Sequence, residues 1–165
     1  MTEAFSAADF RKTLGLFATG VTVITTRGQS TDYGMTATAF SSVSLDPPLV
    51  LVCVIVGNEG ATVIQENGVF AVNILAAEQE AISNYFASRS RPRGRDAFAE
   101  VPHREVATGA PVLYGVVGFL DCRLVATHEA GDHLIFIGGV EALGNDDEVS
   151  PLLFHGSGYR RVATE

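Results

Sequence analysis

The stretch Gly34 to Val52, GMTATAFSSVSLDPPLVLV, decides how this chain folds. A strand-like segment rich in small and hydroxyl residues leads into a turn, which Pro47-Pro48 ends before a second, apolar strand. Hydroxyl and backbone groups along such a segment can line one continuous surface for a planar ligand with a phosphate tail. The stretch has neither the glycine pattern of a Rossmann loop nor the lysine of a P-loop. An ordinary strand, turn and strand remains the alternative, because Thr is common in strands and Ser in turns.

The composition predicts one globular domain over residues 1–165. The chain is 47% hydrophobic and 18% charged, and so low a charge fraction is compatible with an oligomer. The longest apolar run, Pro48 to Gly57, is too short to cross a bilayer. The first ten residues lack the basic start and apolar core of a signal peptide. We therefore expect a cytoplasmic protein without a membrane partner.

The net charge of −8 argues against nucleic acid as a partner, because neutralising phosphates needs a basic face. One segment departs from this acidic background, namely SRSRPRGRD, in which Arg89, Arg91, Arg93 and Arg95 alternate with other residues. The segment is either a solvated loop or a patch that attracts the phosphate of a flavin or dinucleotide, since Arg presents a fork of donors.

The cysteines and histidines do not predict a metal site. Cys53 and Cys122 lie within apolar, strand-like segments and resemble small buried residues. The chain has no CxxC or HExxH motif, and its four histidines are scattered: His103, His128, His133 and His155.

The hydrophobic pattern predicts many strands and few helices. Predicted helices start at Ser6, with Phe10, Leu14 and Phe17 on one side and an end at Gly20, and also cover Ala61–Glu66 and Glu78–Ala87. Predicted strands cover Val21–Thr26, Met35–Phe40, Leu49–Val56, Val69–Leu75, Val112–Thr127, His133–Leu143, Pro151–His155 and Tyr159–Val162. The segment Ser88–Pro111 is predicted to be irregular. Because helices do not alternate regularly with strands, an antiparallel barrel is favoured over a doubly wound sheet.

Four segments, in this order, resemble the short-chain flavin reductases, the reductase components of two-component flavin-dependent monooxygenases in the FMN-binding split-barrel group. They are FRKTLGLFATGVTVITT from Phe10, GMTATAFSSVSLDPP from Gly34, GVFAVNIL from Gly68, and GDHLIFIGGV from Gly131 together with the closing PLLFHGSGYRRV. The resemblance implies a mainly β fold, an antiparallel Greek-key split barrel flanked by short helices.

The same resemblance implies where a flavin would bind. Its ring would lie along Met35, Thr36, Ala37 and Thr38, and contacts would continue along Ser41, Ser42 and Val43. Ribityl and phosphate groups would lie at Gly57–Thr62, with Asn58, Gly60 and Thr62 as candidates. Gly60 stands where the family commonly has a hydroxyl residue, and no Lys or Arg is adjacent. We therefore expect the phosphate to depend more on Arg93 and Arg95.

The resemblance also assigns roles to two residues near the C-terminus. His133, after the Gly131-Asp132 turn, is the expected catalytic residue and would contact the nicotinamide or the flavin. Tyr159 would cover the bound ligand. The alternatives are an ordinary polar residue at a strand start and an aromatic that caps the end of the barrel. Asp121 and Asp132 are expected to be structural.

The implied function is that of an NAD(P)H:flavin oxidoreductase. Hydride would pass from NADH or NADPH to FMN or FAD, a reaction that needs two stacked rings and little acid-base machinery. The resemblance further implies a homodimer and a partner monooxygenase that receives reduced flavin. Two alternatives stay open: a flavin-binding protein without turnover, and a split-barrel relative with another cofactor such as heme.

Overall fold

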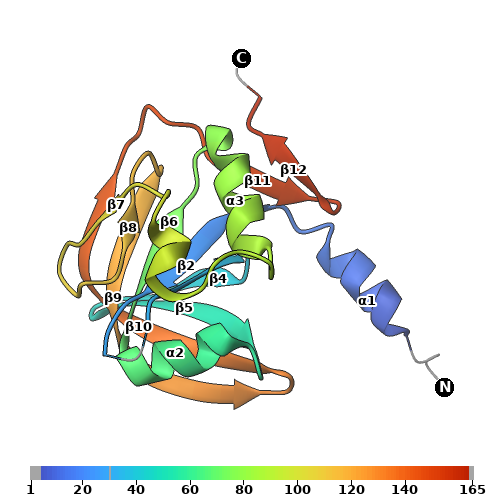
Figure 1. The fold of residues 1–165 in the computed structure, drawn as a ribbon. Helices are drawn as coiled ribbons and strands as arrows, with labels where there is room; N and C mark the ends of the chain where they lie inside the picture. Colours follow the sequence, from blue (N-terminus) through green and yellow to red (C-terminus); the bar gives the residue numbers. More distant parts are fainter. Residues whose placement is uncertain (1–4, 30, 164–165) are drawn as a thin grey trace.

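A computed structural model describes residues 5–29 and 31–163, and it is built around one antiparallel sheet (Figure 1). The helices are α1 (Ala7–Leu14), α2 (Glu59–Asn67) and α3 (Glu80–Ala87), with 3-10 turns η1 (Ala77–Gln79) and η2 (Gly94–Phe98). The strands are β1 (Thr19–Gly20), β2 (Thr22–Thr26), β3 (Tyr33–Ala37), β4 (Phe40–Leu45), β5 (Pro48–Ile55), β6 (Val69–Ile74), β7 (His103–Arg104), β8 (Val112–Leu113), β9 (Gly118–Ala130), β10 (His133–Asn145), β11 (Leu152–His155) and β12 (Gly158–Arg161).

The main sheet has seven strands in the order β3-β2-β6-β9-β10-β5-β4. Neighbouring strands are antiparallel throughout. Strand β5 pairs with β10, so the connection from β5 through α2 to β6 passes over the β9–β10 hairpin. Three successive strands with a fourth brought beside them form a Greek key. The predicted mainly β, antiparallel fold is confirmed.

The stretch Gly34 to Val52 connects the two edges of this sheet. β3 is one edge and β4 the other, yet only Thr38 and Ala39 separate them in the chain. So short a connection brings the two edges together at this corner, which curls the sheet into a barrel-like shape. At the corner, Cys53 donates its backbone N–H to the Ala39 carbonyl. Away from the corner β3 and β4 do not pair, so the seven described strands form an open sheet.

Three clusters of buried residues surround the sheet. The largest fills the concave side, where Val50, Val52 and Phe136 pack against Ile64 of α2. The second lies under α3 and η2 and includes Val23, Phe86 and Phe98. The third lies under the loop that precedes β9. Helix α2 therefore closes one end of the barrel, and α3 covers the outer side of β2 and β3 (Figure 1).

The outward side of β5 and β10 carries no buried cluster in the described part of the chain. Side chains alternate along β5, so Val50, Val52 and Val54 point into the core and their neighbours point outward. Directly paired residues share a face. The outward row of β5 and β10 therefore contains apolar residues that are half-buried or exposed: Leu51, Cys53, Ile55, Ile135 and Ile137. We call this row the outer β5–β10 face.

Helix α1 extends away from the body (Figure 1). Ser6 and Asp9 form the predicted capping box, with the Asp9 N–H donating to Ser6 Oγ at 3.1 Å. The helix ends at Gly15, earlier than the Gly20 predicted, and none of its residues is buried. Phe10, Leu14 and Phe17 are exposed, because no element of the same described chain lies against them. Within the described ranges, no helix is long and apolar enough to span a membrane.

Other predicted boundaries differ as well. The strand predicted over Met35–Phe40 is two strands, because β3 ends at Ala37 and β4 begins at Phe40. Residues 41–44, predicted as a turn, belong to β4 and pair with β5, and the turn itself is at the cis Asp46–Pro47 peptide. The single strand predicted over Val112–Thr127 is interrupted after Leu113. The reason is a change of partner, because β8 pairs with β7 whereas β9 pairs with β6. Gly115 permits the break by adopting a positive φ of 74°.

Candidate functional site

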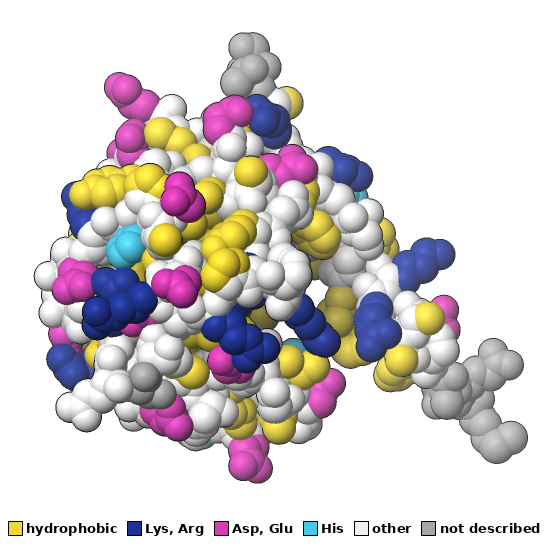
Figure 2. Space-filling model, in the orientation of Figure 1, with side chains coloured by type: hydrophobic (Ala, Val, Ile, Leu, Met, Phe, Trp, Pro, Cys, Tyr) yellow, Lys and Arg dark blue, Asp and Glu magenta, His cyan; other side chains and the backbone are white. Residues whose placement is uncertain are grey.

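A pocket of about 470 Å³ opens between β3, the start of α2 and the loop after α3. Its lining includes Tyr33, Asn58, Glu59 and the arginines Arg89, Arg91 and Arg93. We call it the arginine pocket. The pocket combines the segment predicted to bind ribityl and phosphate groups with three residues of the predicted arginine loop. Basic side chains gather around the hollow on the side of the body that faces α1 (Figure 2).

The first turn of α2 forms one wall of this pocket. Asn58 is the N-cap, and its Oδ1 accepts hydrogen bonds from the Gly60 N–H at 2.8 Å and from the Tyr33 hydroxyl at 3.3 Å. Gly60 is buried, and a Cβ there would lie 2.6 Å from Cε1 of Tyr33. The glycine is therefore required because the Tyr33 ring occupies the space of a side chain. This packing leaves no space for a larger side chain at residue 60.

The charged groups of the pocket differ in how firmly they are held. Arg91 donates to the carbonyls of Gly34 and Ser88, and its guanidinium lies 5.1 Å from the centre of the Tyr33 ring. Arg91 therefore fixes the loop to β3. Arg93 instead forms an exposed ion pair, Nη1 to Glu59 Oε2, at 2.6 Å.

Arg95 does not share a pocket with Arg93. Because η2 starts at Gly94, the two side chains diverge, and Arg95 lines a second pocket of about 370 Å³ with Arg27, His103 and Glu105. Arg27 is already held there by Asp32 at 2.8 Å and by Glu105 at 2.7 Å. The predicted pair Arg93 and Arg95 is therefore separated by the fold.

The predicted ring-binding residues line the corner between β3 and β4. Thr36 Oγ1 donates to the Ser83 carbonyl at 2.6 Å, and the Ala37 carbonyl accepts from Thr22 Oγ1 at 2.7 Å. The Met35 side chain is buried in the core, so only its backbone is available to a ligand. Thr38, Ser41, Ser42 and Val43 are exposed, as is Thr62 on α2.

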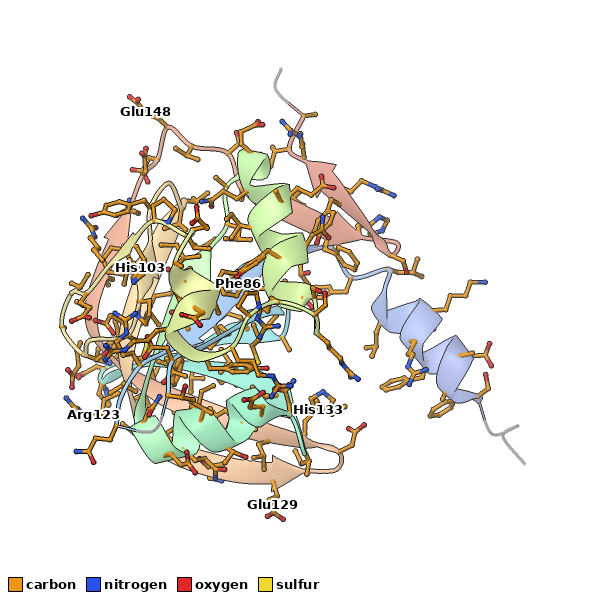
Figure 3. All side chains as sticks on the ribbon, in the orientation of Figure 1. Phe86, His103, Arg123, Glu129, His133 and Glu148 are labelled. Atoms are coloured by element: carbon orange, nitrogen blue, oxygen red, sulfur yellow. The ribbon has the colours of Figure 1, made fainter. Side chains whose placement is uncertain are left out.

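Ser41 and His133 lie on the same side of the sheet. Ser41 pairs with Leu51 and His133 pairs with Ile55, so both side chains belong to the outer β5–β10 face. The two rows are four residues apart along β5, about 13 Å, and Ser41 and His133 lie on the two strands that flank β5. His133 also lies beside the start of α2, on the side facing α1 (Figure 3).

The hydrogen bond with Asp132 orients the His133 ring. Nδ1 of His133 lies 2.7 Å from Oδ1 of Asp132, and this hydrogen bond lowers the pKa of the Asp132 carboxyl. An ionised carboxylate accepts, so Nδ1 carries the proton and Nε2 is left for a ligand. Asp132 is thus a positioning residue. Asp121 is structural, because it is fully buried and accepts from the backbone N–H groups of Ala107 and Thr108 at 2.7 and 2.9 Å.

Tyr159 connects the C-terminal hairpin to α3. Its hydroxyl lies 2.8 Å from Ser83 Oγ and 3.1 Å from Asn84 Oδ1, and its ring packs edge-on against Phe154. Thr36 and Tyr159 therefore contact the same residue, Ser83. The half-buried Tyr159 therefore lies close to the predicted ring-binding strand, through the contact that both make with Ser83.

Tyr33 and Glu59 are among the pocket residues that were not identified from the sequence. Tyr33 directly precedes the stretch Gly34 to Val52, and Glu59 directly follows Asn58. An aromatic at the start of one predicted binding segment and an acid inside the other were the available signals. Their meaning depends on β3 and α2 packing together, which is a long-range contact.

Comparisons with known proteins agree on one family. The model of the flavin reductase like domain matches residues 14–163. An NADH-dependent flavin reductase from a Rhodococcus species is 42% identical over 92% of this chain and 84% of its own. The reductase subunit HsaB of a flavin-dependent monooxygenase from Rhodococcus jostii is 38% identical over 97% of this chain and 80% of its own.

A solved structure is about as similar to this chain as these two relatives are. The NADH:FAD oxidoreductase SgcE6 of Streptomyces globisporus, in complex with NAD and FAD fragments, superposes with a TM-score of 0.88. It is 38% identical and covers 98% of this chain and 98% of its own. The resemblance expected from the sequence is confirmed: the chain belongs to the flavin reductase family.

Proposed function

We propose that this protein is a flavin reductase that transfers hydride from NADH to FMN or FAD and supplies the reduced flavin to a partner monooxygenase. The overall reaction converts NADH, a proton and oxidised flavin into NAD⁺ and reduced flavin. The single observation that carries the proposal is the match of the flavin reductase like domain to residues 14–163. The arginine pocket supports it, because this pocket places Asn58 and three arginines beside β3, where the flavin phosphate is expected.

The proposed binding mode uses the corner between β3 and β4 as its centre. The flavin ring lies along the backbone of residues 35–38 and reaches Ser41, Ser42 and Val43 on β4. The ribityl chain passes Asn58 and Thr62, and the phosphate enters the arginine pocket toward Arg93. Arg95 faces the second pocket and is not assigned to this phosphate.

The chemistry itself comes from the two bound molecules, because the nicotinamide supplies the hydride and the flavin accepts it. The protein contributes position. His133, oriented by Asp132, offers Nε2 to the nicotinamide where it stacks on the central part of the flavin ring. Tyr159 borders the same region beside Thr36. Holding two rings in contact is worth several powers of ten in rate without any acid-base group.

We also propose that the protein is a cytoplasmic homodimer. Two apolar surfaces support this proposal, the outer β5–β10 face and the exposed side of α1 with Phe10, Leu14 and Phe17. Contiguous exposed apolar surface of this kind is typical of an interface. A second copy on the outer face would also exclude water from the surface between Ser41 and His133.

The choice of NADH and of a monooxygenase partner rests on the relatives. Both a flavin reductase and an FAD reductase among them are named as NADH-dependent. The Rhodococcus jostii relative is the reductase subunit of a flavin-dependent monooxygenase.

Turnover in air tests the proposed function. Purified protein is mixed with NADH, with and without added FMN or FAD, and the nicotinamide absorbance is followed. We expect NADH to be consumed only when flavin is present. Flavin binding without NADH loss would favour a flavin-binding protein without turnover. NADH consumption that requires heme and does not depend on flavin would favour a split-barrel relative with another cofactor.

A further inference from the structure

The arginine pocket contains a carboxylate at the position where a phosphate is expected. Glu59 is in the first turn of α2, and its Oε2 lies 2.6 Å from Nη1 of Arg93. Both residues line the pocket. An acidic group beside a proposed phosphate site opposes binding, so its presence there calls for a physical explanation.

The partners of the other pocket residues single out this ion pair. Arg91 is engaged with two backbone carbonyls and the Tyr33 ring, so its guanidinium is fixed. Asp32, the other acid of the lining, is buried and paired with Arg27 at 2.8 Å. Of the three pocket arginines, Arg93 is the one that forms an ion pair with a carboxylate among the described residues, and an incoming anion can replace that carboxylate; Arg89 also lines the pocket but forms no such pair there.

The ion pair between Arg93 and Glu59 is weak enough for a phosphate to replace Glu59. The Arg93 and Glu59 side chains are 76% and 39% exposed, and solvent screens an ion pair at such a site. Glu59 is nevertheless kept in place, because a carboxylate in the first turn of a helix is stabilised by the helix dipole. An incoming phosphate carries a charge of about −1.5 to −2 and must displace Glu59 from Arg93.

We propose that Glu59 is a specificity-determining residue that competes with the flavin phosphate for Arg93. This inference rests on the proposed flavin site. The competition weakens binding of the phosphate of FMN and FAD and leaves binding of the flavin ring unchanged. Phosphorylated flavin therefore exchanges rapidly, as a reductase that passes its product to another enzyme requires. Riboflavin, which has no phosphate, is bound independently of Glu59.

The Glu59→Gln variant tests this directly, with flavin dissociation constants measured by fluorescence quenching. Gln keeps the size of the side chain and removes its charge. We expect FMN to bind about 3- to 10-fold more tightly, the range for losing one screened charge contact. Riboflavin affinity should change by less than about twofold. The tightening should fade at high salt, because screening shortens the range of the interaction.

Glu80→Gln is the matched control, since Glu80 is also in the first turn of a helix but belongs to α3 and lies outside the pocket. It should leave both affinities unchanged. In an Arg93→Ala background, the effect of Glu59→Gln should shrink, because the group for which both anions compete is gone.

Three results would overturn the inference. If wild-type protein binds FMN but Glu59→Gln binds it no better, Glu59 does not compete, while the reductase proposal stands. Equal tightening of riboflavin would mean that the substitution acts on the ring site. If wild-type protein binds no flavin at all, the proposed function fails together with the inference.

Discussion

At the scale of single residues, His133 is the side chain on which we propose that hydride delivery depends. Asp132 holds Nδ1, so Nε2 faces the proposed nicotinamide. His133→Ala should lower kcat/KM for NADH by about 10- to 100-fold, because a ring that is no longer held leaves the reacting geometry. FMN affinity should stay the same. Steady-state kinetics with varied NADH measure the first effect, and flavin titration measures the second.

Glu129→Ala is the control for that substitution, since Glu129 is exposed on the same hairpin and pairs with Leu134, on the opposite face of the sheet from His133. It should behave as wild type. Equal losses in both variants would assign the effect to the hairpin and not to His133.

Cys122 predicts how stability depends on alkaline pH. Burial, with smaller contributions from Asp121 and Glu141, raises the pKa of its thiol to about 12. In the unfolded chain, a cysteine thiol has a pKa of about 8.5. Between these values the unfolded state binds fewer protons, so the free energy of unfolding falls as pH rises, by at most about 1.4 kcal/mol per pH unit.

Urea unfolding at several alkaline pH values measures this slope. Cys122→Ala should flatten the decline relative to wild type, and Cys53→Ala should flatten it less, because Cys53 is only half-buried. Identical slopes in wild type and Cys122→Ala would contradict the assignment to this thiol.

At the scale of elements, the contact between β3 and α2 depends on Gly60. A Cβ there would lie 2.6 Å from the Tyr33 ring and 3.0 Å from Sδ of Met35. Gly60→Ala should therefore destabilise the fold by about 1–3 kcal/mol through overpacking. Gly20→Ala is the control, because a Cβ at Gly20 meets nothing within 4 Å. Denaturant midpoints compare the two, and equal midpoints would show that β3 and α2 do not pack as described.

The elements also show what sequence reasoning could predict. Local patterns located β2, β5, β6, α2 and α3 to within a few residues, because each has a strong period or a clear cap. The serines of β4 were assigned to a turn, since nothing local reveals that they pair with β5. The break after Leu113 was missed because it depends on the partner strand β7.

In the candidate site, too, local sequence patterns predicted some features, whereas features that depend on long-range contacts were missed. Motif positions such as Asn58, Arg93 and His133 could be chosen from the sequence. The separation of Arg93 from Arg95 could not, since it depends on how η2 turns the chain. The ion pair between Arg93 and Glu59 joins residues 34 positions apart, beyond the reach of any local pattern.

At the scale of the whole molecule, the uncovered apolar surfaces predict a dimer. Ile55 is 49% exposed on the outer β5–β10 face, and Val106 is 45% exposed on a loop elsewhere. Ile55→Asp should convert the dimer to a monomer, because a charge cannot be buried there without a partner. Val106→Asp should leave the dimer intact. Light scattering during size exclusion gives both masses, and a wild-type monomer would contradict the prediction.

Anaerobic mixing of the protein with NADH and FMN tests the central claim most directly. Without oxygen, reduced flavin accumulates, so the loss of the visible flavin absorption reports hydride transfer itself. We predict that the protein bleaches FMN rapidly and in proportion to the NADH consumed, and that His133→Ala does so slowly. Flavin that stays oxidised while bound to the protein in the presence of NADH would contradict the account.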